Sequence, residues 1–142
     1  MPGNETLLYY LKFSIVIGLL FTASVWDIRK RIVPDFLPIL LTACCFIPKA
    51  EFHPSGLFIA IALLLIGTII GGIGGGDIKM IAAYGLLRGA FETCIALTIT
   101  MLLLILFRGL KCIITKNKKC NKAYPMMPFF LVGSIIGFLL CM

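Results

Sequence analysis

The chemistry open to this chain depends on its acidic side chains, because aspartate and glutamate together number only six among 142 residues. Glu5 and Glu51 lie in polar stretches that water reaches. Glu92 lies four residues after Arg88, a spacing that favours an ion pair within one helix. Three acids remain as candidates for chemistry: Asp27, Asp35 and Asp77.

Two of these candidates follow long apolar runs. Asp27 comes after the run 7–26, and Asp77 comes after the glycine-rich end of the run 55–76. Two carboxylates that share a site split their titration, so one can act as a base toward water while the other acts as an acid. Such a pair hydrolyses an amide bond without a metal or cofactor. The alternative is that the acids cap helices, with Asp35 before the second run and Asp77 before the fourth.

The elements that must position these acids are apolar helices. The chain is 61% hydrophobic and 13% charged, with a mean hydropathy of +1.09, whereas soluble domains are about half apolar and a quarter charged. This composition excludes an ordinary soluble globule, a disordered chain and a soluble nucleic-acid binder. A membrane-spanning helix needs roughly 20 residues, so we predict one all-α integral-membrane domain over 1–142, with about six transmembrane helices and short loops.

Two of the runs depart from the length of an ordinary span. The run 36–48 is short, and with the residues before it could just cross a thinned bilayer. The run 80–107 would be about 42 Å long as one helix, against a hydrocarbon core of about 30 Å. We therefore expect a break near Arg88–Gly89 that divides it into a short fourth span and a full fifth span.

The basic residues set the orientation of these spans. The net charge is +7, and ten of the 13 lysines and arginines fall on one side of the six-span arrangement if the N-terminus is external. The positive-inside rule makes that side cytoplasmic. The lipid bilayer then explains the basic charge without nucleic acid. Asp27 and Asp77 both fall at the cytoplasmic face.

Metal and nucleotide sites are not indicated. No two cysteines are separated by the two to four residues typical of zinc ligands, and the one histidine, His53, falls in an expected loop. The glycine run 71–76 lacks the lysine and serine or threonine of a phosphate-binding loop. We expect Gly74 and Gly76 to give the backbone beside Asp77 freedom and room for a substrate strand. Glycines four residues apart, such as Gly133 and Gly137, predict close helix packing, as does Gly18 within its own repeat of small residues.

The residues 74–79, Gly-Gly-Gly-Asp-Ile-Lys, resemble the Gly-x-Gly-Asp-x-Lys motif of type IV prepilin peptidases, which belong to the GxGD class of membrane aspartyl proteases. The stretch 27–35, Asp-Ile-Arg-Lys-Arg-Ile-Val-Pro-Asp, is similar to the other motif of that family. The stretch 124–129, Tyr-Pro-Met-Met-Pro-Phe, resembles the entry to its last helix. The three matches occur in the family's order and span most of the chain.

The resemblance implies that Asp27 and Asp77 are the catalytic pair. It implies cleavage of the short basic leader from prepilins, pseudopilins or Flp-like prepilins at the cytoplasmic face of the inner or plasma membrane. The substrate would carry an N-terminal leader and a hydrophobic helix. Long family members carry Cys-x-x-Cys pairs and also methylate their product; this chain lacks such pairs and resembles the short, peptidase-only form. Lys79 would anchor the active-site loop, tune Asp77 or mark the cytoplasmic side.

Two other classes of function remain open. One is a small proton- or cation-coupled transporter or channel subunit that uses Asp27 and Asp77 as its ion site. The other is a membrane protein that only packs helices. Acids at the ends of spans, beside basic residues, favour the protease, whereas acids near the middle of the bilayer would favour transport.

Overall fold

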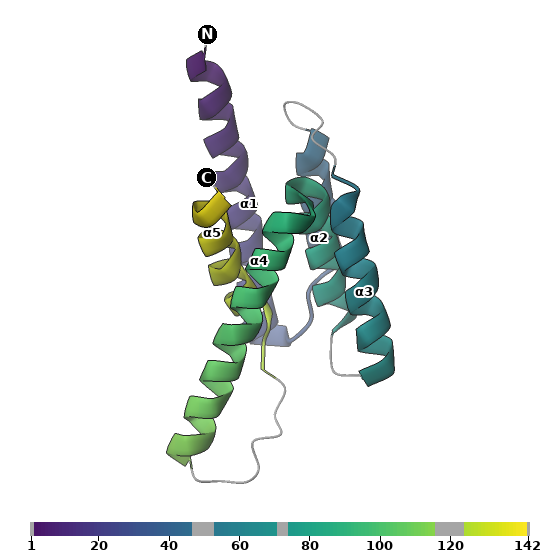
Figure 1. Cartoon of the computed structure of the whole chain (residues 1–142), viewed down its shortest axis with the longest axis vertical. Coiled ribbons are helices and arrows are strands. Elements are labelled where there is room, and N and C mark those ends of the chain that lie inside the picture. Colours follow the sequence, from purple (N-terminus) through teal and green to yellow (C-terminus); the bar gives the residue numbers. More distant parts are fainter. Residues whose placement is uncertain (1, 47–52, 71–73, 116–123, 142) are drawn as a thin grey trace.

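The computed structural model describes residues 2–46, 53–70, 74–115 and 124–141. Its elements in chain order are α1 (Pro2–Lys30), α2 (Phe36–Ala43), the 3₁₀ helix η1 (Cys44–Phe46), α3 (Ser55–Ile70), α4 (Gly75–Thr115) and α5 (Met127–Cys141). The described residues contain no strand, so the predicted all-α class is confirmed for them. Helix α4 runs obliquely between α5 on one side and the α2–α3 pair on the other (Figure 1).

Two helices have the length and apolar composition needed to cross a membrane, over Thr6–Lys30 in α1 and Gly75–Ile114 in α4. Three shorter apolar helices cover Phe36–Phe46, Ser55–Ile69 and Met127–Cys141. At 1.5 Å per residue, the shortest of these is about 16 Å long, against a hydrocarbon core of about 30 Å. The structure thus supports a helical integral membrane protein, which is a coarser result than the predicted count of about six spans.

Helix α4 consists of two helices that meet at Gly89. This residue has φ 82° and ψ 173°, a conformation outside the helical region that side chains with a Cβ rarely adopt. The predicted break near Arg88–Gly89 is therefore confirmed. The start of α3 lies against this kink, because the backbone N–H of His53 donates to the carbonyl of Leu86 at 2.9 Å.

Helix α1 ends at Lys30, three residues after Asp27. Arg31 adopts φ 54°, and its N–H donates to the carbonyl of Asp27 at 2.9 Å. This is the left-handed cap that commonly closes a helix, here without the usual glycine. The cap turns the chain into the connection to α2, so Asp27 lies in the final turn of α1.

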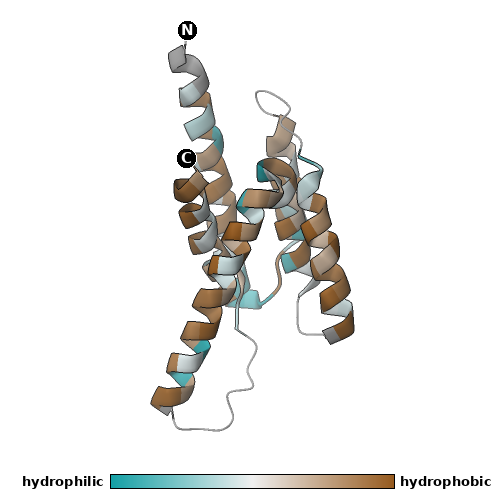
Figure 2. Cartoon of the chain, in the orientation of Figure 1, coloured by the Kyte–Doolittle hydropathy of each residue, from teal (hydrophilic) through white to brown (hydrophobic). Residues whose placement is uncertain are grey.

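The core lies where α1, α2, α4 and α5 meet. Its largest fully buried apolar side chains come from all four helices: Val16, Leu20, Leu37, Leu41, Met80, Ile81, Tyr84, Met127 and Phe130. The rings of Tyr84 and Phe130 pack edge to face with centroids 5.3 Å apart. The outer faces are also apolar (Figure 2), and Phe58, Ile69 and Phe91 are 74–82% exposed. Apolar side chains facing outward in this way fit a lipid surrounding rather than water.

Small residues set the closest helix contacts. A Cβ added to Gly133 would collide with the carbonyl of Ala96 on α4 and lie 2.5 Å from the Thr100 hydroxyl. The predicted packing face of α5 is therefore confirmed. The equivalent prediction for Gly18 is wrong, since nothing lies within 4 Å of an added Cβ there. Gly56 on α3 and Gly85 on α4 also approach each other closely. Neither glycine belongs to a repeat from which close packing was predicted.

Candidate active site

Asp27 is held by a backbone group from the far end of the sequence. The side chain is buried, with 6% of its surface exposed. Its Oδ2 accepts a hydrogen bond of 3.0 Å from the backbone N–H of Met127, a residue 100 positions away. Because Met127 is the first residue of α5, this bond joins the end of α1 to the start of the last helix. In the sequence, the stretch 124–129 is notable only for its resemblance to a family motif, and nothing in it predicts this contact.

Asp77 lies in the first turn of α4, beside Gly76, which packs against Val33 in the connection between α1 and α2. Its N–H donates to the carbonyl of Gly74 at 3.0 Å, and Gly75 is the first residue of the helix. Asp77 is therefore the third helical residue and not the residue that caps the helix, which corrects the capping alternative. Its carboxyl is partly buried and close enough to Asp27 for the two charges to interact. The structure thus places the two predicted acids within reach of each other's charge.

The glycines before Asp77 fit α4 against the connection between α1 and α2. A Cβ added to Gly76 would lie 3.1 Å from Cβ of Val33 and 3.3 Å from its carbonyl oxygen. Beside Gly75, by contrast, nothing lies within 4 Å. A Cβ on Gly74 would approach the Oδ2 of Asp77 to 3.3 Å. The space beside Gly76 is therefore filled by the protein itself, and open space lies beside Gly75.

Lys79 and Asp35 form a second link between the two motif regions. The Nζ of Lys79 lies 2.7 Å from Oδ1 of Asp35, and both side chains are exposed. Asp35 does occupy the N-cap position of α2, as expected, but its side chain makes no capping hydrogen bond. Lys79 therefore anchors the first turn of α4 to the start of α2. An exposed ion pair of this kind contributes at most about 1 kcal/mol.

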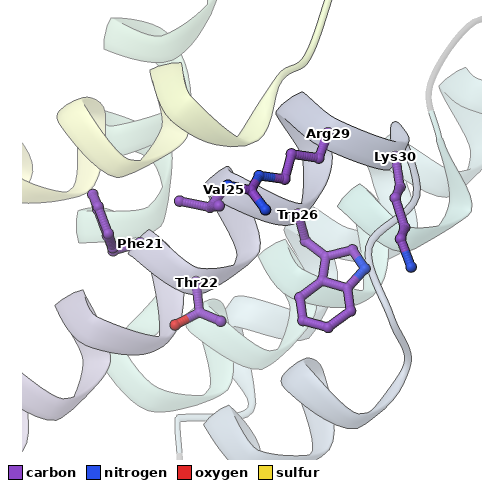
Figure 3. Close-up of a pocket in the computed structure, with 6 residues that line it drawn as sticks. All are labelled: Phe21, Thr22, Val25, Trp26, Arg29 and Lys30. Carbon is purple, nitrogen blue, oxygen red and sulfur yellow. The ribbon is translucent and has the colours of Figure 1, made fainter.

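Two mostly apolar depressions lie on the helices that carry the acids. One, of about 490 Å³, lies on the outer face of α1 and is lined by Phe21, Thr22, Val25, Trp26, Arg29 and Lys30 (Figure 3). The Nζ of Lys30 lies 5.4 Å from the centre of the Trp26 ring. The other, of about 670 Å³, runs between α2 and α4 from the Lys79–Asp35 pair toward Phe46 and Leu86. Neither depression is lined by Asp27 or Asp77, but the first includes Trp26, which precedes Asp27, and the second includes Lys79, two residues after Asp77.

A separate polar cluster lies further along α4. The predicted ion pair between Arg88 and Glu92 is confirmed, with 2.8 Å between Nε and Oε1, and both side chains are largely buried. The hydroxyl of Tyr84 donates to the same Oε1 at 2.9 Å. Aromatic rings from α1 and α5 surround the guanidinium, with centroids 4.9–5.7 Å from Cζ: Tyr9, Phe13 and Phe138. The i,i+4 spacing predicted the pair, but the burial and the rings arise from tertiary packing.

The chemical capacity of the site follows from its two carboxyls. The described residues contain no group of three or more histidine, cysteine or acidic side chains that could hold a metal ion. Two interacting carboxyls can share one proton, because ionising both in a partly buried site is costly. A water molecule between them could then be deprotonated by one and a carbonyl oxygen protonated by the other.

Comparison with known proteins is consistent with this geometry. A sequence model of the type IV leader peptidase family matches residues 14–109, which is more than half of the chain and includes both Asp27 and Asp77. Over 134 residues the chain is 29% identical to a protein of Bacillus subtilis (strain 168) named prepilin leader peptidase/N-methyltransferase. The alignment covers 88% of this chain and 54% of that protein, so the chain spans about half the length of this curated relative. No solved structure matches the chain.

Proposed function

Because the chain belongs to the type IV leader peptidase family, we propose that it is a membrane aspartyl endopeptidase that removes the leader from prepilins, pseudopilins or Flp-like prepilins. Asp27 and Asp77 are the catalytic pair. The observation that supports this assignment is that these two acids lie in terminal helix turns where their charges interact. Only three aspartates exist in the chain, and the third, Asp35, is exposed and paired with Lys79.

The proposed reaction is hydrolysis by activated water. One carboxylate of the pair takes a proton from water, and the resulting oxygen attacks the carbonyl carbon of the scissile peptide bond. The other carboxyl gives its proton to the carbonyl oxygen. The tetrahedral intermediate then collapses as the newly protonated acid gives a proton to the leaving nitrogen, and the second carboxyl recovers its own. The pair returns to its starting state with one shared proton and one water consumed.

The surroundings of the pair support a substrate that lies in the membrane. We place about six spans in the bilayer of the inner or plasma membrane, with both acids at its cytoplasmic face. The apolar surface on α1 includes Trp26, the residue before Asp27, and the one between α2 and α4 includes Lys79, two residues after Asp77. A prepilin helix in the bilayer could therefore bring its leader junction to the pair without leaving the lipid. Gly74, Gly76 and Lys79 shape the first turn of α4 and keep Asp77 in place.

A processing assay tests this proposal. Purified full-length protein in phospholipid vesicles is mixed with a prepilin that has a basic leader, a glycine junction and an apolar helix, and the product is identified by mass. We expect cleavage by the wild type and none by Asp27→Asn or Asp77→Asn. Asp35→Asn is the matched control, since it makes the same chemical change at an exposed acid. Its pair with Lys79 contributes at most about 1 kcal/mol, so this variant should keep cleavage to within about fivefold of the wild type. Cleavage by either dyad variant contradicts the proposed mechanism.

The alternative function, a proton- or cation-coupled transporter or channel subunit, makes the opposite prediction in the same preparation. Its acids would carry ions across the bilayer, so Asp27→Asn and Asp77→Asn would abolish ion flux into vesicles. The position of both acids in terminal helix turns favours the peptidase. If the folded wild type cleaves no prepilin but carries protons into vesicles, the peptidase proposal fails.

A further inference from the structure

The two acids of the proposed pair differ in what their oxygens contact. Oδ2 of the buried Asp27 accepts the N–H of Met127 at 3.0 Å. The carboxyl of the partly buried Asp77 accepts no hydrogen bond that the structure records from any described residue. A hydrogen bond donated to a carboxylate stabilises its charged form. The pair is therefore asymmetric before any substrate binds.

The donor is a special kind of amide. Met127 is the first residue of α5, and the carbonyl of Met126 already accepts the N–H of Phe130, which closes the first turn. The N–H groups of a first helical turn have no partner within their own helix. The N–H of Met127 is such a group, and Asp27 supplies the missing acceptor. The partial positive charge at the start of this 15-residue helix acts in the same direction.

From this asymmetry we propose that the N–H of Met127 holds Asp27 as the ionised member of the pair, so that Asp77 carries the shared proton. This inference rests on the proposed function and assigns a separate role to each acid of the pair. Asp27 takes the proton from water, and Asp77 protonates the carbonyl oxygen of the scissile bond. On collapse, Asp27 delivers its proton to the leaving nitrogen, and Asp77 recovers a proton from the intermediate. Met127 acts through Asp27 and is a positioning residue.

Other charged side chains lie on the helices around the pair. Helix α4 contributes Asp77 and Lys79, and the start of α2 contributes Asp35, which Lys79 neutralises at 2.7 Å. Helix α1 itself contributes the exposed cations at positions 29–31. The described part of α5 carries no charged side chain. The backbone N–H of Met127 is therefore the contact from α5 that distinguishes Asp27 from Asp77.

The test removes this one hydrogen atom. Proline lacks an N–H and is favoured at the first position of a helix, so Met127→Pro deletes the donor where the backbone tolerates it. The matched control is Met127→Ala, which removes more of the buried side chain but keeps the N–H. Cleavage of the prepilin is measured as kcat/KM across a range of pH for wild type and both variants, and circular dichroism confirms that each is helical.

A hydrogen bond to a charged group typically contributes about 1.5–3 kcal/mol. Met127→Pro should therefore lose roughly tenfold to a hundredfold in kcat/KM relative to Met127→Ala at neutral pH. The pH below which activity falls should rise by about one to two pH units, because Asp27 is then protonated more readily. If the N–H of Met127 had a purely structural role, its loss would lower activity without changing the pH below which activity falls. Identical pH profiles for the two variants overturn the proposal.

A second measurement needs neither cleavage nor a proline variant. In Asp27→Asn the pair retains only Asp77, and in Asp77→Asn it retains only Asp27. The infrared band of the protonated carboxyl is followed with pH in both full-length proteins. The difference between the two sets of spectra removes the bands of the other acids, which both variants share, and leaves those of Asp27 and Asp77. The proposal requires that the band of Asp77 persists to higher pH than that of Asp27, and the reverse order overturns it. If wild type fails to cleave, the proposed function fails, while this titration still decides the assignment.

Discussion

Replacing Glu92 with glutamine tests what the buried ion pair contributes. Glu92 is 7% exposed, and its Oε1 accepts hydrogen bonds from Arg88 Nε at 2.8 Å and from the Tyr84 hydroxyl at 2.9 Å. Glutamine keeps the shape and the Oε1 acceptor, so the bond from Tyr84 can persist. What disappears is the negative charge that neutralises a guanidinium enclosed by aromatic rings.

The magnitude follows from the burial of both partners. Removing one member of a buried ion pair costs about 3–5 kcal/mol, because the remaining charge is left uncompensated. The double variant Arg88→Met/Glu92→Gln removes the cation as well, and methionine is an unbranched apolar chain that suits a pocket lined by rings. We expect the double variant to regain most of the loss and to lie within about 1 kcal/mol of the wild type. The two substitutions should thus be strongly non-additive.

The assay is reversible unfolding of the full chain in lipid bicelles, followed by helical circular dichroism. The single tryptophan, Trp26, packs edge to face on Phe36 with centroids 6.2 Å apart and gives an independent fluorescence signal at the other end of the bundle. Coincident transitions by the two probes support two-state unfolding. The reasoning is refuted if Glu92→Gln is as stable as the wild type, or if the double variant is as unstable as the single one.

Three further predictions use the same unfolding measurement. Asp35→Asn should cost no more than about 1 kcal/mol, because its partner Lys79 is exposed, and a larger loss would contradict the surface character of that pair. Gly133→Ala should destabilise the protein by about 1–3 kcal/mol through overpacking against α4, whereas Gly18→Ala, which meets open space, should not destabilise it. Arg31→Gly should stabilise it by about 1 kcal/mol, because its φ of 54° is costly for any residue with a Cβ; a loss of stability would show that the arginine side chain matters more than the backbone.

The local features of the fold were largely predictable, because each depends on neighbouring residues. Apolar composition predicted helices, and the length of the run 80–107 predicted the break that the structure places at Gly89. The four-residue spacing predicted the Arg88–Glu92 pair. The run 36–48 was expected to be short for a span, and α2 with its 3₁₀ extension is indeed too short to cross an ordinary bilayer alone. Gly18 shows the limit of local patterns, since a repeat of small residues does not say whether a partner helix lies beside it.

The candidate site divides in the same way. The amino-acid sequence alone identified Asp27 and Asp77 as candidates, because acids are rare in so apolar a chain and both follow apolar runs. It also placed Lys79 beside them, but its ion pair with Asp35 required the start of α2 to meet the first turn of α4. Only the tertiary structure decided that Asp27 receives the N–H of Met127 and Asp77 does not. A residue's type and near neighbours determine its helix and its charge, whereas a contact across 100 residues depends on how the whole bundle packs.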